Sequence, residues 1–362
     1  MKKLISFMLF ACMIVGLFTA CKGNGNTPSS QGETSSETVT QSTQSGEDYS
    51  NLKIAMISDP IGNEQFILQA YNAIKNMADQ YGFQWSSIEC VDTAAWEENS
   101  RGVAAEGYDL LVAVGWQAAG PFSTLADEYP DTKFAVIDTL AENEKVKSIN
   151  FNTAEGCYVL GAMIGTAFQD ENFFGYVCNF QDQASYEYRY GFAEGVKSII
   201  PEAQFMFNYA NSYSDTSVVY ELSMQQAAAG ATFIFGGVSN SANTGIYQAA
   251  LEQGEKGTPI YTTGLSVDQT TADNPYIIGG VTKQTDICME MVLKEFLEGD
   301  FQGGKQTLGI REGAFGVVGV TTGGFNYRNQ KIMTDEVIEA GKAALEDLIQ
   351  GSVVIEVPSE AK

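Results

Sequence analysis

The chain has 362 residues with 20 basic and 45 acidic side chains, a formal net charge of −25 and no histidine. The absence of histidine excludes Ser-His-Asp and Cys-His catalysis and histidine metal sites, and a chain this acidic is repelled by nucleic acid and by anionic lipid headgroups. The sequence has neither a GxGxxG segment after a predicted strand nor a GxxxxGKS/T loop. We therefore expect a binding protein rather than an enzyme, without a cofactor, a metal or a nucleic-acid partner.

Residues 1–20 have the pattern of a secretory signal peptide. Lys2 and Lys3 precede an apolar run over 4–18, which is shorter than the roughly 20 residues that a membrane-spanning helix needs. The following Thr19-Ala20-Cys21 resembles a bacterial lipobox, in which the cysteine receives a lipid after cleavage, although Phe18 stands where leucine is usual. We expect lipidation at Cys21. The alternative is an ordinary signal peptide with an incidental cysteine.

Residues 21–50 are rich in Ser, Thr, Gly, Gln and Glu and have almost no apolar side chains. Such a segment cannot bury enough surface to offset the entropy lost on ordering. We expect a flexible linker that holds a folded domain off the membrane by its lipid anchor.

Four cysteines follow the linker, and they lie far apart among apolar residues with no CxxC pair. This pattern predicts buried free thiols rather than a metal site. They are Cys90, Cys157, Cys178 and Cys288.

Predicted strands and helices alternate along the remainder of the chain. Continuous apolar runs are typical of parallel strands buried on both faces, and apolar residues at helical spacing lie between them. The alternation predicts an α/β fold, and the number of units predicts two Rossmann-like lobes. The strands are expected at 53–59, 108–115, 133–138, 173–178, 204–210, 231–237, 259–264, 276–282 and 315–321, and the helices at 65–81, 121–129, 186–200, 215–230, 241–254 and 333–350.

Polar and small residues stand where these strands end. In parallel sheets, ligands meet the loops at the carboxyl ends of the strands. Two aspartates, one aromatic ring and several small or amide residues suit a neutral polar ligand with a flat face, and arginine and lysine do not gather there as a phosphate would require. The residues at these ends are Asp59, Gly115, Trp116, Asp138, Gly236, Gly237, Ser239, Asn240, Gly264, Ser266 and Lys283.

Several stretches together resemble the basic membrane protein family, the substrate-binding lipoproteins of ABC transporters that include bacterial purine nucleoside receptors. The resemblance covers residues 53–318. It is carried by IAMISDPIGNEQFILQAYNAI, YDLLVAVGWQAAGPFSTLADEYPDTKFAVID, SINFNTAEGCYVLGAMIG, YRYGFAEGVKSIIPEAQ, YSDTSVVYELSMQQAAAGATFIFGG and GGVTKQTD.

The resemblance implies a type I periplasmic-binding-protein fold, in which two lobes close on a small-molecule ligand and the closed form meets a membrane permease. The chain would cross between lobes near Phe151, near residues 282–284 and once more in the C-terminal region. We expect lobe 1 to contain residues 51–151 and about 284–315, and lobe 2 to contain residues 152–283 and the C-terminal segment.

The resemblance also implies roles for individual residues. The nucleoside base would lie between Phe66 and Phe235 and be read by Asp138, with Lys283 at a crossover. The alternative for the two phenylalanines is core packing, and Trp116 is either a pocket wall or packing. The family has a side-chain amide in its opening loop, for which Asn63 is a substitute. It has Val-Asp-Ser-Asp-Gln where this chain has 265–269, so Ser266 replaces an aspartate that usually holds sugar hydroxyls. The candidate ligand-binding residues are Asp59, Asn63, Phe66, Trp116, Asp138, Phe235, Gly237, Asn240, Ser266, Asp268 and Lys283.

We therefore predict a monomeric, extracytoplasmic solute-binding lipoprotein of an ABC importer, anchored at the cell membrane, which binds a nucleoside or a related small polar molecule. One alternative is a binding protein for another solute, such as a sugar or a signalling molecule. The other is an adhesin or sensor without a role in transport.

Overall fold

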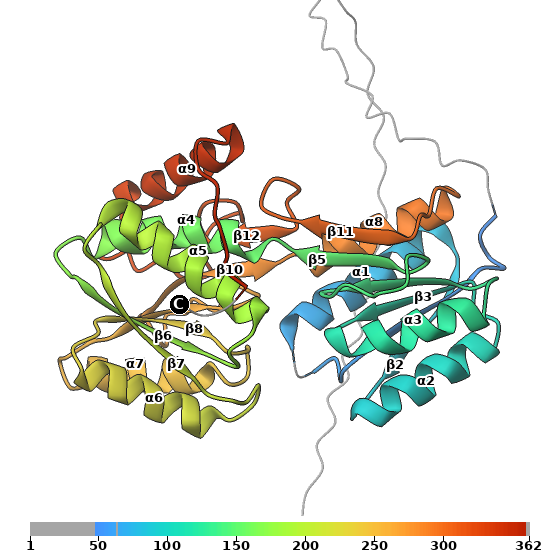
Figure 1. Ribbon diagram of the computed structural model, residues 1–362, viewed down its shortest axis with the longest axis horizontal. Coiled ribbons are helices and arrows are strands. Elements are labelled where there is room, and N and C mark those ends of the chain that lie inside the picture. Colours follow the sequence, from blue (N-terminus) through green and yellow to red (C-terminus); the bar gives the residue numbers. More distant parts are fainter. Residues whose placement is uncertain (1–47, 63, 360–362) are drawn as a thin grey trace, which may run out of the picture. The chain divides into compact units, whose positions relative to one another are not determined.

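The computed structural model describes residues 48–62 and 64–359. They belong to one of the two compact units into which contacts divide the chain, the unit Glu47–Lys362. The predicted signal peptide, Cys21 and nearly all of the predicted linker lie outside the described residues, and so does Asn63. The described residues form two six-stranded sheets (Figure 1).

The first sheet is built from strands that are largely apolar on both faces. Its order is β11-β5-β4-β3-β1-β2, and all neighbouring strands run parallel. In β1, Ile54 and Met56 face one helix layer and Ala55 and Ile57 face the other, because successive side chains of a strand point to opposite sides. The strands are β1 (Lys53–Ser58), β2 (Gln84–Glu89), β3 (Leu110–Val114), β4 (Lys133–Ile137), β5 (Lys147–Phe151) and β11 (Gly304–Leu308).

The second sheet repeats this arrangement in the order β12-β10-β9-β8-β6-β7. Its strands are parallel except for the edge strand β12, which runs antiparallel to β10. The strands are β6 (Phe173–Cys178), β7 (Gln204–Tyr209), β8 (Phe233–Gly237), β9 (Tyr261–Gly264), β10 (Ile277–Lys283) and β12 (Phe315–Val317).

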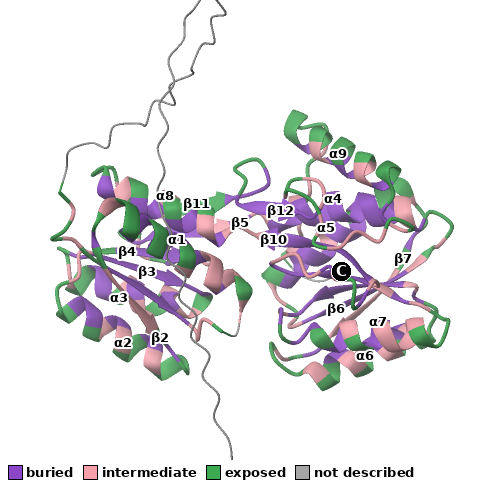
Figure 2. Cartoon of the chain, turned by 180° about the vertical axis from the view of Figure 1, so that it is seen from behind, coloured by how far each residue is buried: buried purple, intermediate pink, exposed green. Residues whose placement is uncertain are grey.

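Helices cover both faces of each sheet, and their buried sides face the strands (Figure 2). We call the first sheet with α1, α2, α3 and α8 lobe 1, and the second sheet with α4, α5, α6, α7 and α9 lobe 2. None of the helices within the described residues is both long and apolar enough to cross a lipid bilayer. The helices are α1 (Gln65–Tyr81), α2 (Thr93–Ala105), α3 (Ala119–Glu128), α4 (Thr153–Ala167), α5 (Gln183–Ile199), α6 (Thr216–Ala228), α7 (Thr244–Glu255), α8 (Thr285–Leu297) and α9 (Asp335–Gln350), with a short 3-10 helix, η1 (Trp116–Ala118), before α3.

Capping side chains fix several helix starts. Asp92, Asp182 and Asp215 accept hydrogen bonds from the first backbone N–H groups of α2, α5 and α6. Thr334 does the same for α9, so this helix begins at residue 335 rather than at the predicted 333. Helix α1 ends at Gly82, whose φ of 83° is a conformation that glycine adopts without strain.

The chain passes between the two sheets three times. It leaves lobe 1 after β5, at Asn152, and returns after β10, at Gln284; it leaves again between β11 and β12, over residues 309–314. The sequence predicts crossings near Phe151, near residues 282–284 and in the C-terminal region. Helix α8 follows a strand of the second sheet but packs against α1 of lobe 1 (Figure 1).

The cysteines of the folded unit lie in its core. Cys90, Cys157, Cys178 and Cys288 are buried and carry free thiols. This confirms the prediction made from their apolar surroundings.

Helices α4 and α5 pack closely because glycines line their interface. A Cβ atom added at Gly161 would lie 2.3 Å from the carbonyl oxygen of Phe192, and one at Gly195 would lie 2.1 Å from that of Tyr158. These obstacles are backbone atoms, so the helices would have to move apart to admit a methyl group. The first crossing therefore leads directly into a tightly packed helix pair.

Gly161→Ala is expected to lower the free energy of unfolding by roughly 1–3 kcal/mol through overpacking of this interface. Urea unfolding would measure the change. Gly102→Ala is the matched control: this exposed glycine in α2 has nothing within 4 Å of an added Cβ, and alanine there should raise stability by about 0.5–1 kcal/mol. Equal effects at the two positions would contradict the close packing of α4 and α5.

Candidate functional site

The strand order predicts where a ligand would bind. In the first sheet the order reverses between β1 and β3, and in the second between β6 and β8. At such switch points the loops after neighbouring strands diverge and leave a crevice at the carboxyl ends. The predicted residues Asp59, Trp116 and Asp138 follow β1, β3 and β4, and Asn240 and Ser266 follow β8 and β9.

A charged pair joins the two sheets at this edge. Lys283, the last residue of β10, donates a hydrogen bond from Nζ to Oδ1 of Asp138 at 2.6 Å. Their side chains are only 15% and 20% exposed, and the ammonium lies 5.4 Å from the centroid of the Phe151 ring. Burial lowers the pKa of Lys283, but Asp138 and the neighbouring Tyr188 raise it by more, so the pKa lies above the usual value of lysine. Lys283 therefore carries its charge at neutral pH.

Two predicted site residues have an unusual backbone conformation. Asp138 has φ 77° and Ser266 has φ 66°, in a left-handed region that residues other than glycine seldom adopt. The third such residue in the described part of the chain is Asn211, which follows β7. The carbonyl of Ser266 accepts a hydrogen bond from the backbone N–H of Lys283 at 3.0 Å, so this residue is connected to the charged pair. Residues with strained backbone conformations of this kind are often found at functional sites.

In lobe 1, Asp59 organises the ends of β1 and β3. Its two carboxylate oxygens accept hydrogen bonds from Trp96 Nε1 at 3.2 Å and from Gln117 Nε2 at 2.9 Å. Within the described part of the chain, Gln117 Oε1 is buried without a hydrogen-bond partner. Trp116, next to it, is 58% exposed. Asp59 therefore holds an amide in place beside an exposed aromatic ring.

A carboxylate of lobe 1 reaches the loop after β8 in lobe 2. Glu64, just before α1, accepts a hydrogen bond from Ser241 Oγ at 3.3 Å. Burial raises the pKa of Glu64, although the neighbouring Asn240 and Ser241 oppose that rise. Asn240 is itself buried, and its Oδ1 accepts a hydrogen bond from Gln269 at 2.9 Å. Phe66, in the first turn of α1, is half-buried and packs against the hydrophobic core.

Two predicted residues of lobe 2 lie in its core instead of on a free surface. Phe235 is fully buried, and its ring stacks on Tyr176 at 5.5 Å and on Phe192 at 5.1 Å between centroids. Gly237 is buried as well, and its carbonyl accepts a hydrogen bond from Cys178. In this structure the side chain of Phe235 is occupied by packing against α5.

Asp268 is occupied by contacts within lobe 2. Its Oδ1 accepts hydrogen bonds from the N–H and hydroxyl of Thr270, and its Oδ2 accepts one from the N–H of Asn326 at 2.6 Å. These bonds join the loop after β9 to a C-terminal segment. The structure therefore gives Asp268 a role in holding that segment.

Two aromatic residues that the sequence reasoning did not select lie at the carboxyl edge of lobe 2. Phe180 follows β6 and Tyr213 follows β7, and their ring centroids are 5.0 Å apart. Tyr213 is 45% exposed. Burial raises its pKa, and the charges of Asp182 and Asp138 add to the rise, which places the phenol within electrostatic reach of the charged pair. Their loops have no periodic pattern that could have predicted these positions.

Glu187 is the other residue that the sequence reasoning missed. It lies in α5 and is partly buried. Burial raises its pKa from 4.5 to about 6, although Lys283 and Thr153 both favour the charged form. The charges of Lys283 and Asp138 act on the pKa of this carboxylate in opposite directions.

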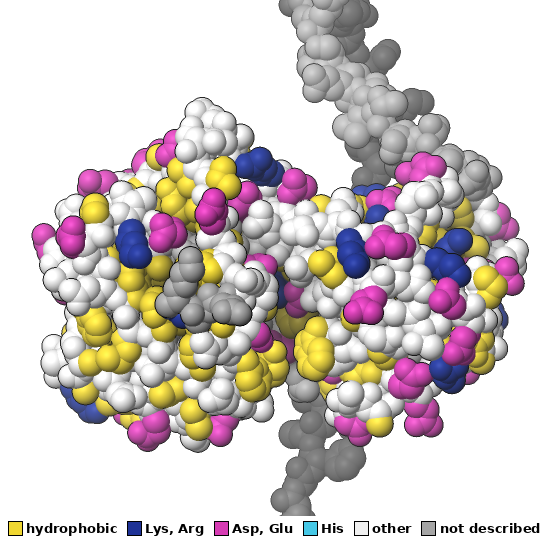
Figure 3. Space-filling view, viewed as in Figure 1, with side chains coloured by type: hydrophobic (Ala, Val, Ile, Leu, Met, Phe, Trp, Pro, Cys, Tyr) yellow, Lys and Arg dark blue, Asp and Glu magenta, His cyan; other side chains and the backbone are white. Residues whose placement is uncertain are grey.

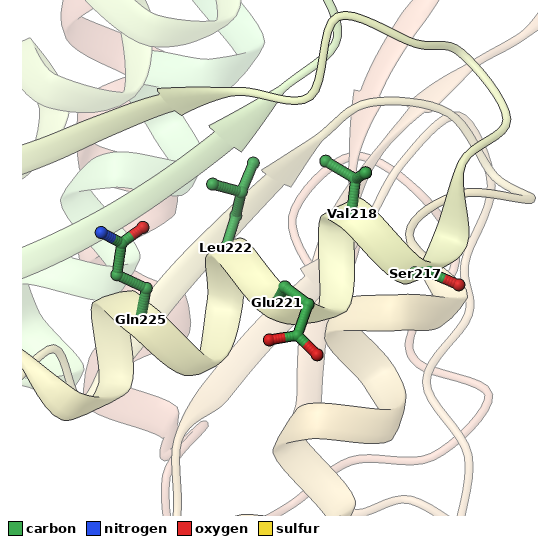
Figure 4. Close-up of a pocket in the computed structure, with 5 residues that line it drawn as sticks. All are labelled: Ser217, Val218, Glu221, Leu222 and Gln225. Atoms are coloured by element: carbon green, nitrogen blue, oxygen red, sulfur yellow. The ribbon is translucent and has the colours of Figure 1, made fainter.

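Two surface hollows lie outside this set of residues. One, of about 420 Å³, runs along α6, where Val218, Leu222 and Gln225 project from one side of the helix and Glu221 points away (Figure 4). The other, of about 630 Å³, lies where β8 and β9 begin and includes Tyr261. None of the predicted site residues lines either hollow. Unlike these two hollows, the strand ends combine the largely buried charges of Asp138 and Lys283 with the exposed rings of Trp116 and Tyr213.

Comparisons with known proteins agree on one family and one fold. A family model described as "ABC transporter substrate-binding protein PnrA-like" matches residues 52–359. An uncharacterized lipoprotein of Pyrococcus abyssi is 24% identical over 98% of this chain and 84% of its own length, and the ABC transporter nucleoside-binding protein BmpA of Lactococcus lactis is 21% identical over 86% and 91%. A solute-binding protein of an ABC transporter from Aeropyrum pernix superposes with a TM-score of 0.72 at 19% identity, over 85% of this chain and 94% of its own. This likeness confirms the predicted two-lobe fold of periplasmic binding proteins.

Removing the charge of Glu187 is expected to change how stability depends on pH. The folded-state pKa of about 6 lies above the ordinary 4.5, so the stability linked to Glu187 is complete below pH 4.5 and is lost as pH rises through 6. Relative to Glu187→Gln, the wild type should lose about 2 kcal/mol of unfolding free energy from well below pH 4.5 to well above pH 6. Urea unfolding at a series of pH values measures this, with Glu98→Gln on the exposed side of α2 as the control. Parallel pH profiles for wild type and Glu187→Gln would refute the assignment.

Proposed function

Because the chain belongs to the family of PnrA-like ABC transporter substrate-binding proteins, we propose that it binds a nucleoside or a related small polar molecule and delivers it to a membrane permease. The family is one of solute-binding proteins, and a relative in Lactococcus lactis is named a nucleoside-binding protein. The proposed role is capture and release by a monomer, without chemical conversion of the ligand.

The observation that carries the choice of ligand is the grouping of charge and aromatic rings at the strand ends. Asp138 and Lys283 supply a buried acceptor and donor, and Trp116 and Tyr213 are exposed rings at the edges of the two lobes. A nucleobase offers a flat face for stacking and an edge of donors and acceptors. Stacking is worth on the order of 1–3 kcal/mol per ring where nucleic-acid-binding proteins have been measured.

An acceptor that lacks a partner supports the same ligand class. Gln117 Oε1 is buried with no hydrogen-bond partner in the described residues, and such an atom costs roughly 1–3 kcal/mol. A base N–H or a sugar hydroxyl would remove that cost. Because Asp59 fixes the other end of the amide, the acceptor is held in place before the ligand arrives.

A nucleotide carries the negative charge of a phosphate and a nucleoside does not, so the charged side chains of the site bear on which of the two it binds. Acidic side chains are spread over the visible face in Figure 3, with lysines and arginines scattered among them. At the strand ends, Lys283 is already paired with Asp138, and Arg189 is engaged by Tyr209 and by the ring of Phe207. A phosphate would need cations that these contacts already use. We therefore propose an unphosphorylated ligand.

Ligand capture requires that the closed form binds better than the open form. Three crossing segments connect the lobes, which is the arrangement of a hinge. The hydrogen bond from Ser241 to Glu64 joins the lobes at the strand ends, where a trapped ligand would lie. We propose that ligand binding and this contact together stabilise closure.

We also propose that a lipid at Cys21 holds the protein at the extracytoplasmic face of the membrane. Relatives in Pyrococcus species are named lipoproteins, and residues 21–50 have the composition of a tether. A single acyl chain binds a membrane weakly, whereas two chains anchor it stably.

Cys21→Ala is expected to move the protein from the membrane fraction into the soluble fraction and to remove the lipid mass from its N-terminal peptide. Cell fractionation with mass spectrometry of that peptide measures both. Cys12→Ala, within the apolar run, is the control and should leave anchoring unchanged. Membrane association that persists without Cys21 would exclude lipidation at this residue.

A calorimetric panel of nucleosides, free nucleobases and sugars tests the ligand class. We expect heat from at least one nucleoside, with the matching free base bound within about tenfold, because Ser266 lacks the charge that would hold ribose hydroxyls. Ser266→Asp should then favour the nucleoside over its base by roughly tenfold, since a charge-assisted hydrogen bond is added. Ser266→Asn, which also tolerates a positive φ, is the uncharged control. Binding of a sugar with no response to nucleosides or bases would overturn the proposal.

A further inference from the structure

Asn240 has a buried amide whose donor group is unpaired. The residue lies in the loop between β8 and α7, at the carboxyl end of a strand of the second sheet, and is only 7% exposed. Its Oδ1 accepts a hydrogen bond from Gln269 Nε2 at 2.9 Å. Its Nδ2 is buried and has no hydrogen-bond partner among the described residues. A buried donor without a partner is costly, so an acceptor supplied by a ligand would be stabilising here.

A chain of hydrogen bonds fixes the orientation of this amide. The Tyr247 hydroxyl donates to Oε1 of Gln269, and Gln269 donates from Nε2 to Asn240. Tyr247 is itself held in place, because its carbonyl accepts a hydrogen bond from Asn274 Nδ2 at 2.8 Å. With its oxygen bonded to Gln269, Asn240 has its N–H donors left for a ligand.

The loop that carries Asn240 is bonded to the segment that carries the exposed ring of Tyr213. Ser239, which precedes Asn240, donates a hydrogen bond from Oγ to the carbonyl of Tyr213 at 2.7 Å. Asn243, later in the same loop, donates from Nδ2 to the carbonyl of Gly236 at 2.9 Å. These bonds hold the loop in one conformation and connect the unpaired donor to the aromatic edge of lobe 2.

The same loop faces lobe 1. Ser241, which follows Asn240, donates a hydrogen bond to the Glu64 carboxylate at 3.3 Å. Asn240 also neighbours this carboxylate, but its Nδ2 makes no hydrogen bond to it. Asn240 therefore lies where the two lobes meet at the carboxyl ends of their strands, which is where a ligand is expected.

We propose that Asn240 determines ligand specificity: its Nδ2 donates a hydrogen bond to an acceptor atom on the edge of the bound base. This inference rests on the proposed function, and it names the contact by which the site would select among bases. A base that stacks on an aromatic ring keeps its ring nitrogens and carbonyl oxygens free for hydrogen bonds along its edge. Because the donor is buried, a ligand without an acceptor at this position would leave it unpaired and would bind less well.

The first test compares adenosine, guanosine, cytidine and uridine with their free bases by calorimetry. Asn240→Asp keeps the shape of the side chain and the acceptor for Gln269 but lacks the donor. For the nucleoside that binds the wild type most tightly, this variant should lower the affinity by roughly tenfold to a hundredfold. The free base should lose the same factor, because the contact is made to the base. A loss confined to the nucleoside would place the contact on the sugar and overturn the inference.

Ser241→Asp is the matched control for the added charge. It places a carboxylate next to Asn240 in the same loop and keeps the Nδ2 donor, so its loss of affinity should be several times smaller than that of Asn240→Asp. Equal losses in the two variants would show that the charge, and not the missing donor, weakens binding, and the inference would fail.

A second measurement observes the donor itself. In protein labelled with nitrogen-15, the side-chain amide signals of Asn240 are assigned from their loss in Asn240→Asp. Saturation with the tightest-binding of the four nucleosides should move one Nδ2 proton downfield and slow its exchange with water. The Nδ2 group of Asn243, already bonded to the Gly236 carbonyl, is the internal control and should change little. Asn240 signals that stay in place while the nucleoside binds would overturn the inference.

The two tests separate the possible failures. If none of the four nucleosides and none of their bases binds the wild type, the proposed function fails and the role of Asn240 fails with it. If one of them binds wild type and Asn240→Asp equally well, the proposed function stands and the inference alone fails.

Discussion

The structure depends on one ion pair that belongs to both sheets. Lys283 is the last residue of a strand in the second sheet, and Asp138 follows a strand in the first. Removing either partner would leave an uncompensated charge in a largely buried place, which is strongly destabilising, so the two strand ends are held together. The same pair lies where β10 of the second sheet and β4 of the first sheet end. An ion pair between the two sheets can keep the lobes aligned at this point while their outer edges move.

The fold could largely be predicted because its central strands are apolar on both faces. A run such as that of β3 can only be buried between two helix layers, and the regular alternation with helical segments then implies parallel sheets. The strands and α-helices that were not predicted are β2, β5, β11, α2, α4 and α8. Two of them, β2 and α2, show how a polar sequence conceals an element. Strand β2 lies at a sheet edge, is only half-buried and reads QWSSIE, and helix α2 begins with TAAWEENS, whose polar residues obscure the apolar side. Their burial depends on neighbours that the local sequence does not reveal.

The candidate site was predictable where it follows from strand ends and not where it depends on side-chain direction. Asp138 and Lys283 were selected because they end strands, and the structure brings them into contact. Phe235 also lies near a strand end, but the twofold period of the strand turns its ring toward α5 and into the core. Tyr213 lies in a loop, where no period applies, yet it is exposed at the edge where a ligand ring would stack. A sequence pattern predicts where a strand or helix runs, but tertiary packing determines in which direction an aromatic side chain points.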